Sequence, residues 1–350
     1  YQHDPLLVLV RNKLHLPASW CAIGTALLAT AVLIGGFVLA GVATLEEDLG
    51  ITLLQSVIIL PTGVVIYMLL PDALADLFIT LRRNGVVGKP LGSVYDSYAA
   101  FERALIARVD SRWWVTIAVL GVSLYWLYRL KANVPNDLTR HADPQIRLLL
   151  RLAILIVYSP ALYGAFVSLP RFLVGLVHTR RLFQSFAIRV NPLHPDGSAG
   201  MAAIGRMLML GVLVATAIGA AAFVMALAGR DVFSRPELWV LIAIYLISLP
   251  SLFLGWLWMP HRALVAARDE ALAPLALEFL RSLPAALPSA HEGAATIKGS
   301  TDRLAEIKRQ YELLMDTFPV WPIRTATLNR LAVTSLLPLI LFPSAGTTCM

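Results

Sequence analysis

The chain has 350 residues, of which 58% are hydrophobic and 15% are charged, and it carries a formal net charge of +7. Because soluble domains contain about 25% charged residues, this composition excludes an ordinary soluble protein and predicts an all-α polytopic membrane protein. The lysines and arginines fall in short segments beside apolar runs, as anchoring in a membrane requires. We therefore expect the lipid bilayer, and no nucleic acid, as a partner.

The apolar runs predict the membrane-spanning helices. A helix needs about 20 mostly apolar residues to cross a hydrocarbon core about 30 Å thick. Six runs meet this requirement, namely residues 20–43, 51–70, 113–130, 148–169, 207–228 and 238–259. A seventh apolar run, residues 331–342, is shorter and contains Pro338. It is interpreted as either a last span or a re-entrant segment.

The segments between these runs predict a cytoplasmic helical region. Residues 94–114 have a helical pattern that is expected to continue directly into the third span. After Pro260, two amphipathic stretches predict a helical hairpin, and the second has one apolar face made of Leu304, Ile307, Tyr311, Leu314 and Met315. The expected domains are a membrane domain at residues 1–260, the hairpin at 261–324 and a last apolar segment at 325–350.

The distribution of basic residues predicts that the N-terminus is cytoplasmic. Short cytoplasmic connections keep lysine and arginine, and the connections after the second and fourth spans are rich in both. The connection after the first span, residues 44–48, reads TLEED and has no basic residue. The connection between the third and fourth spans disagrees, since it contains Lys131, Arg140 and Arg147. The expected location is a bacterial inner (plasma) membrane.

The most polar and turn-prone stretch of the chain is NPLHPDGSAG, residues 191–200, between the fourth and fifth spans. Asp196 and Gly197 are a typical turn pair, and Gly200 permits a close backbone approach before the next helix. Asp196 and Ser198 are both candidates to cap that helix, which makes the stretch a structural bend. The alternative is that His194 and Asp196 bind a ligand at the helix terminus. Two ligands do not make a metal site, so no metal is expected.

Two short stretches resemble a known group of proteins. HPDGSAGMAAIG, residues 194–205, resembles a His-Pro-Asp-Gly cytoplasmic loop found in uncharacterised bacterial multi-span membrane proteins, and FPVWPI, residues 318–323, resembles a second mark of that group. The resemblance implies a shared membrane architecture and no particular reaction. Ala199 stands where the pattern would have a second glycine.

Two carboxylates, Asp72 and Asp76, lie four residues apart just past the second span and share a helix face. Carboxylates at membrane depth often mark an ion path, which makes both candidates for one. The alternative is that they lie in the headgroup region and pair with Arg82 or Arg83.

Two further sets of residues have predicted positions: charged residues that follow the fourth span, and small residues within two of the spans. Arg171 and His178 follow the fourth apolar run, and both are expected to extend to the membrane interface. Small residues at four-residue spacing let helix backbones approach closely, and two such sets are predicted to be packing faces. They are Gly36 and Ala40 in the first span, and Gly211, Ala215 and Gly219 in the fifth.

The sequence has none of the metalloprotease, phosphate-loop, nucleophile-elbow or dinucleotide motifs, so we expect no enzyme activity and no cofactor. The favoured hypothesis is a homo-oligomeric ion channel with a cytoplasmic helical bundle. This arrangement is similar to that of the seven-span insect chemoreceptor channels, in layout alone. The alternatives are a secondary transporter that uses proline-kinked spans, and a non-catalytic membrane sensor or scaffold, which would need exposed apolar residues on the hairpin. The ion or small-molecule ligand stays open.

Overall fold

The structure is a computed structural model that describes residues 2–40, 55–92, 94–131, 144–227, 236–286 and 294–323, together with residues 329 and 333. It is mostly helical, and five of the described helices are long and apolar enough to cross a membrane. The seventh apolar run, residues 331–342, lies outside the described residues apart from residue 333.

The described elements include a helix at each of the six long apolar runs. In chain order the elements are α1 (Pro5–Leu7), the π-helix η1 (Val8–Lys13), α2 (Ala18–Ala40), the π-helix η2 (Gln55–Ile59), α4 (Leu60–Arg83), β1 (Val87–Pro90), α5 (Tyr98–Val109), α6 (Arg112–Lys131), α8 (Pro144–Ser185), β2 (Phe186–Ile188), α9 (Ala202–Leu227), α10 (Pro236–Ala286) and α11 (Ala294–Thr317). Helix α6, which contains the third run, is not among the five helices that are long and apolar enough to cross a membrane.

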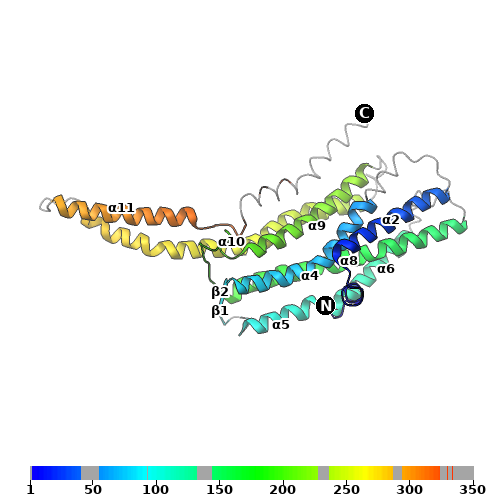
Figure 1. Cartoon of the computed structure of the whole chain (residues 1–350), viewed down its shortest axis with the longest axis horizontal. Helices are drawn as coiled ribbons and strands as arrows, with labels where there is room; N and C mark the ends of the chain where they lie inside the picture. The colour runs from blue at the N-terminus through cyan, green and yellow to red at the C-terminus, as the bar shows by residue number, and fades with distance from the viewer. Residues whose placement is uncertain are drawn as a thin grey trace, which may run out of the picture.

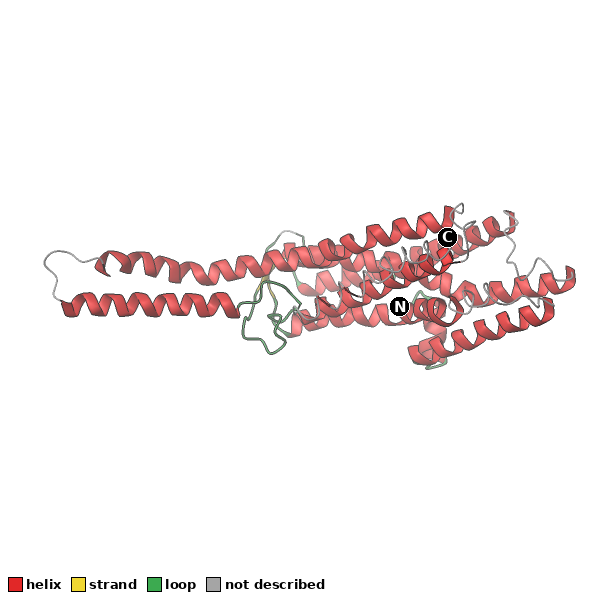
Figure 2. Ribbon diagram, turned by 90° about the horizontal axis from the view of Figure 1, so that it is seen from above, coloured by secondary structure: helices red, strands yellow, loops and turns green. Residues whose placement is uncertain are grey.

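The helices form a bundle with one long projection. Figure 1 shows α2, α4, α6, α8 and α9 side by side with the first half of α10, and α4 contacts α2, α8 and α9. Beyond the bundle, α10 continues and packs against α11 as a hairpin, which Figure 2 shows from above. The hairpin projects from one end of the bundle. The strands β1 and β2 and the first turn of α5 lie at the same end.

Helices α4 and α8 continue well past the apolar runs that predict them. Helix α4 extends to Arg83 and α8 to Ser185, because their sequences keep an apolar face beyond the hydrophobic run. In α4 this face is buried and includes Leu74, Leu77 and Leu81. The antiparallel pair of β1 and β2, with Val87 opposite Ile188, joins the two helix ends. This end of the bundle is therefore packed core and not a set of loops.

The expected join between residues 94–114 and the third span is wrong. Helix α5 ends at Val109 and α6 begins at Arg112. Asp110 and Ser111 interrupt the helix, and the Ser111 hydroxyl accepts the Trp113 backbone N–H at 3.4 Å. Aspartate and serine side chains compete with the helical backbone for hydrogen bonds, which favours a break at this pair.

The expected helix boundary at Pro260 is also wrong, because α10 continues through it as one helix of 51 residues. A proline removes a single backbone hydrogen bond, and α10 is held by α9 on one side of this point and by α11 on the other. The domain boundary at residue 260 therefore falls inside a continuous helix, which connects the bundle to the hairpin.

Within the hairpin, four of the five residues expected on the apolar face of α11 are at least partly buried. Ile307 is 5% exposed, and Leu304, Tyr311 and Leu314 are half-buried. Their spacing of three, four and three residues makes a single seam against α10. Met315 is 43% exposed, so its expected place on that face is wrong. It follows Leu314 directly and therefore points about 100° away from the seam.

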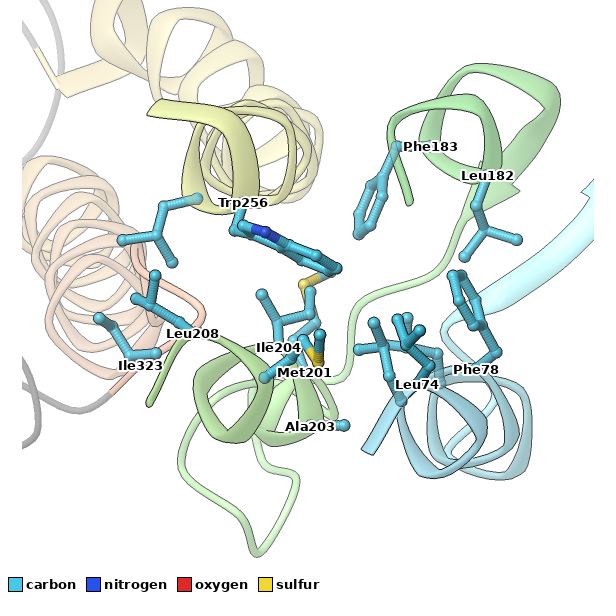
Figure 3. Packing of buried hydrophobic residues seen from close by; sticks show 14 of the residues in the cluster. Leu74, Phe78, Leu182, Phe183, Met201, Ala203, Ile204, Leu208, Trp256 and Ile323 are labelled. Atoms are coloured by element: carbon cyan, nitrogen blue, oxygen red, sulfur yellow. The ribbon is translucent and has the colours of Figure 1, made fainter. Parts of the chain in front are cut away.

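The largest hydrophobic core lies where α4, α8, α9 and α10 meet. Figure 3 shows Trp256 of α10 above Met201 and Ile204 at the start of α9, with Leu74 of α4 nearby. Trp256 is fully buried, and its ring lies 3.5 Å from the position that a Cβ at Gly175 would take. The centre of the described bundle is thus filled by side chains.

Candidate functional site

The loop between β2 and α9 is organised by the carboxylate of Asp196. Its Oδ1 accepts the backbone N–H groups of Ser198 at 2.8 Å and Gly200 at 3.0 Å, and its Oδ2 accepts that of Ala202 at 3.2 Å. Because α9 begins at Ala202, these bonds satisfy donors at the helix start. His194 Nδ1 lies 2.9 Å from Asp196 Oδ1. The arrangement is that of a helix cap with a neighbouring imidazole.

The surroundings of Asp196 act on its pKa in opposite directions. Burial raises the pKa, whereas the backbone donors of Gly200, Ser198 and Ala202 and the His194 side chain lower it. The hydrogen bonds outweigh the burial, so the pKa of Asp196 lies below its ordinary value. The carboxylate is therefore ionised at neutral pH, which suits the positive end of the helix dipole.

The same loop is tied to the end of α4. The Asn84 side-chain amide donates to the Gly200 carbonyl at 2.8 Å. Gly200 has φ +91, and a Cβ added there would lie 2.9 Å from a methyl group of Val86. Gly197 (φ 63) and Ala199 (φ 54) are also left-handed. Ala199 thus adopts, at a cost of about 1–2 kcal/mol, the backbone conformation that glycine takes freely, at the position where the sequence pattern suggests glycine.

The second stretch of the resemblance, residues 318–323, lies against the same part of the bundle. His261 of α10 lies with Nδ1 2.9 Å from the Val320 carbonyl oxygen, and its ring stacks on Trp321 with 4.1 Å between ring centroids. A methyl group of Ile323 lies 2.7 Å from the position of a Cβ at Gly205. The two stretches, more than a hundred residues apart in sequence, are therefore in contact through Gly205 and Ile323.

Asp72 and Asp76 each pair with an arginine, but not with the arginines expected. Arg11 binds both oxygens of Asp72 at 2.7 Å, and Arg206 of α9 binds Asp76 Oδ2 at 2.7 Å. The Asp72 and Asp76 side chains are 65% and 53% exposed. Successive turns of α4 present the two carboxylates to different neighbours, so they join separate elements to α4 instead of forming one site.

Arg82 lies elsewhere, beside the first turn of α5. Its guanidinium is 4.7 Å from the centre of the Tyr98 ring and 3.9 Å from a Glu102 oxygen. Burial raises the pKa of Tyr98 to about 12, so its hydroxyl keeps its proton and donates to the Phe78 carbonyl at 2.9 Å. Tyr98 also lines an open pocket of 470 Å³ between β1, β2 and α5, with Lys89 and Arg189 on its walls.

The expected interfacial position of Arg171 and His178 is wrong, since each residue is 1% exposed. Helix α8 does not end at the apolar boundary, and α5 covers the turns that carry both residues. His178 Nδ1 lies 2.8 Å from the Val174 carbonyl oxygen. Arg171 NH1 lies 2.8 Å from Asp4 Oδ2, and Asp4 is itself 0% exposed.

Arg171 and Asp4 form the centre of a buried polar cluster that the sequence did not predict. The hydroxyl groups of Tyr67 and Tyr163 donate to Asp4 Oδ1 at 2.6 and 3.1 Å. Arg171 Nε donates to the Val109 carbonyl at 3.2 Å. A lone arginine after an apolar run was a visible signal, but nothing in the local sequence marks Asp4 as its partner.

The small residues singled out in α9 lie in its packing face. A Cβ added at Gly211 would lie 2.7 Å from a side chain of α10 and 2.8 Å from one of α8. Ala215 and Gly219, on the following turns, are buried. In α2, Gly36 is buried, and the side-chain surroundings of Ala40 lie outside the described part of the chain.

Comparisons with known proteins found no protein-family model, no curated protein and no solved structure that matches this chain. Among the residues that the structure describes, no group of three or more His, Cys, Asp or Glu side chains could hold a metal ion. The two most organised polar arrangements of the described bundle are the Asp196 cap and the buried Arg171 cluster.

Replacing Asp196 with alanine should lower stability by about 1–2 kcal/mol, because the start of α9 loses its cap. The pKa of Asp196 is lower in the folded than in the unfolded state, so its contribution is complete above the unfolded value and is lost as pH falls through the folded one. The difference in melting temperature between wild type and Asp196→Ala should therefore be constant at neutral pH and shrink as the pH falls below about 4. His194→Ala, which keeps the three backbone bonds, is the control. A pH-independent difference would contradict this account.

Replacing Arg171 with methionine should lower the free energy of unfolding by about 3–5 kcal/mol, because the Asp4 carboxylate stays buried without its cation. The matched control is Arg206→Met, which breaks the exposed pair with Asp76 and should cost about 0–1 kcal/mol. Both are measured by thermal unfolding in lipid nanodiscs. Equal melting temperatures of the two variants would show that the buried pair contributes no more than the exposed one.

Proposed function

We propose that the chain forms a homo-oligomeric ion channel whose subunits associate through the projecting part of α10. The observation that carries the proposal is a line of leucines on that part of the helix. Leu277, Leu280 and Leu283 are 54%, 62% and 37% exposed. Their spacing of three residues puts them on one side of α10, and α11 packs against another side.

The environment of this leucine line favours a protein partner. Helix α11 carries exposed charged side chains, including Arg303, Lys308 and Glu312, so the hairpin belongs in water and not in lipid. Apolar side chains gathered on a water-facing helix usually mark an interaction surface. A second copy of the same hairpin is the partner that the channel hypothesis supplies.

The continuity of α10 connects this contact to the membrane. Its 51 residues have a length of about 76 Å at 1.5 Å per residue, and they include the sixth apolar run. Neighbouring hairpins in contact would hold their α10 helices together at the membrane surface. Because the core around Trp256 is filled by side chains, the ion path in this proposal runs between subunits and not through one bundle.

The proposed topology has six spans, in α2, η2 with α4, α6, α8, α9 and the first half of α10, with a cytoplasmic N-terminus in a bacterial inner membrane. The projection of the hairpin and the β1–β2 pair at the same end of the bundle supports a single cytoplasmic side. In this proposal residues 331–342 add a seventh span or a re-entrant segment, and the chain belongs to the group of proteins with the His-Pro-Asp-Gly loop.

The leucine line also supports a second candidate, a non-catalytic sensor or scaffold whose hairpin binds a different protein. A secondary transporter has less support. The two carboxylates that would couple it to ions, Asp72 and Asp76, are exposed and paired with arginines. The experiment below therefore separates the channel from the scaffold.

The particle mass and the conductance of the purified protein in lipid test the proposal. Wild type should form a closed ring of three or more subunits and conduct ions in planar bilayers. Leu280→Glu should dissociate the ring and remove the conductance, because a buried charge opposes the contact. Leu313→Glu, at a residue of α11 that is 64% exposed and outside the leucine line, is the matched control and should leave both unchanged.

A monomeric wild-type particle overturns the channel proposal. A ring that depends on Leu280 but carries no current favours the scaffold. A ring unaffected by Leu280→Glu contradicts the role given to α10.

A further inference from the structure

Three side chains of the bundle converge on one carboxylate that comes from outside it. Arg171 and Tyr163 belong to α8, and Tyr67 belongs to α4. The carboxylate is that of Asp4, in the segment before the first apolar helix, and it is 0% exposed. Arg171 lies 2.8 Å from its Oδ2, and the tyrosine hydroxyls donate to its Oδ1 at 2.6 and 3.1 Å.

The three donors match the chemistry of a carboxylate group. A guanidinium lies 2.8 Å from one oxygen as an ion pair and two neutral hydroxyls donate to the other, so the charge of the carboxylate is balanced. The Val109 carbonyl accepts from Arg171 Nε and holds the guanidinium in place. The donors lie on two packed helices, with Tyr67 and Tyr163 in edge-to-face contact. The side-chain donors thus belong to the bundle, and the segment itself adds only the Leu7 backbone N–H, which donates to Asp4 Oδ1 at 3.3 Å.

The segment that supplies Asp4 has one fully buried apolar anchor. Of the residues in α1 and η1, Leu7 alone is buried, and η1 has no buried residue. Its other polar contacts include those of Arg11 with Asp72 and with the part-buried Met68 carbonyl, and those of the Gln2 and His3 backbone with Asp110. Leu6 and Val10 pack against the same core but are only half-buried, so displacing residues 2–13 would expose Leu7 fully and these two in part.

We propose that Arg171, Tyr67 and Tyr163 form a binding site for a small monocarboxylate of the size of formate or acetate, which Asp4 occupies as an internal ligand. The inference is independent of the proposed channel. A free carboxylate competes with Asp4 for the same donors, and its binding releases residues 2–13 from the bundle. Because Asp4 is tethered, it acts as a competitor at an effective concentration of the order of millimolar. Removing its carboxylate should therefore raise the affinity for acetate.

The test is a titration of the full chain in lipid nanodiscs with sodium acetate, against sodium chloride at the same ionic strength. In Asp4→Ala, acetate should raise the melting temperature in a saturable way while chloride does not. The acetate midpoint should be at least about tenfold lower than in wild type. Asp4→Ala combined with Arg171→Gln should show no acetate effect, and Asp4→Ala combined with Arg206→Gln, at the exposed pair, should keep it.

A second readout uses the unaltered protein. In wild type, acetate should speed hydrogen exchange of the backbone amides of residues 5–13, whereas chloride should not. The proposal is overturned if Asp4→Ala folds but responds equally to acetate and chloride, or if its response survives Arg171→Gln. If Asp4→Ala does not fold, the wild-type exchange decides, and an unchanged rate at saturating acetate overturns the proposal.

Discussion

The buried pair of Arg171 and Asp4 is the constraint around which the bundle is arranged. A guanidinium without a partner inside a helical bundle costs several kcal/mol, so the arrangement must bring a carboxylate to it. That requirement places the segment before α2 against α8, and Tyr67 brings α4 to the same point. The Val109 carbonyl adds the end of α5. The pair thus joins α4, α5, α8 and the N-terminal segment at one point.

From this point the helices continue past the apolar runs as packed core. Helix α4 extends about three turns beyond Asp72, and the Asp196 cap and the β1–β2 pair close the end of the bundle. The stretch with Ile323 packs on the start of α9 at the same end, beside the point where α10 leaves the bundle. The hairpin is therefore attached to a packed base. In the proposed channel, such a base would transmit a contact between subunits to the membrane.

The sequence was most informative where the determining interactions are local. Six apolar runs predicted helices because the length and hydropathy of a run need no partner, and Asp196 lies within six residues of every backbone donor that it caps. Contacts between distant residues could not be predicted in this way. Arg171 looked interfacial because its partner, Asp4, lies far away in sequence, and Asp72 pairs with Arg11 instead of its neighbours Arg82 and Arg83. Hydropathy also could not predict where α8 and α10 end, because beyond the apolar runs these helices pack against other helices and not against lipid.

A double-mutant cycle between Asp4 and Arg171 in lipid nanodiscs is the most direct test of the constraint on which this account depends. The variants are Asp4→Leu, Arg171→Met and their combination, compared by their free energies of unfolding. The account predicts that the combination is less destabilised than the sum of the single changes by about 2–3 kcal/mol, because neither charge is then left buried alone. Effects that add to within about 0.5 kcal/mol would mean that the two residues do not depend on each other, and would contradict the account.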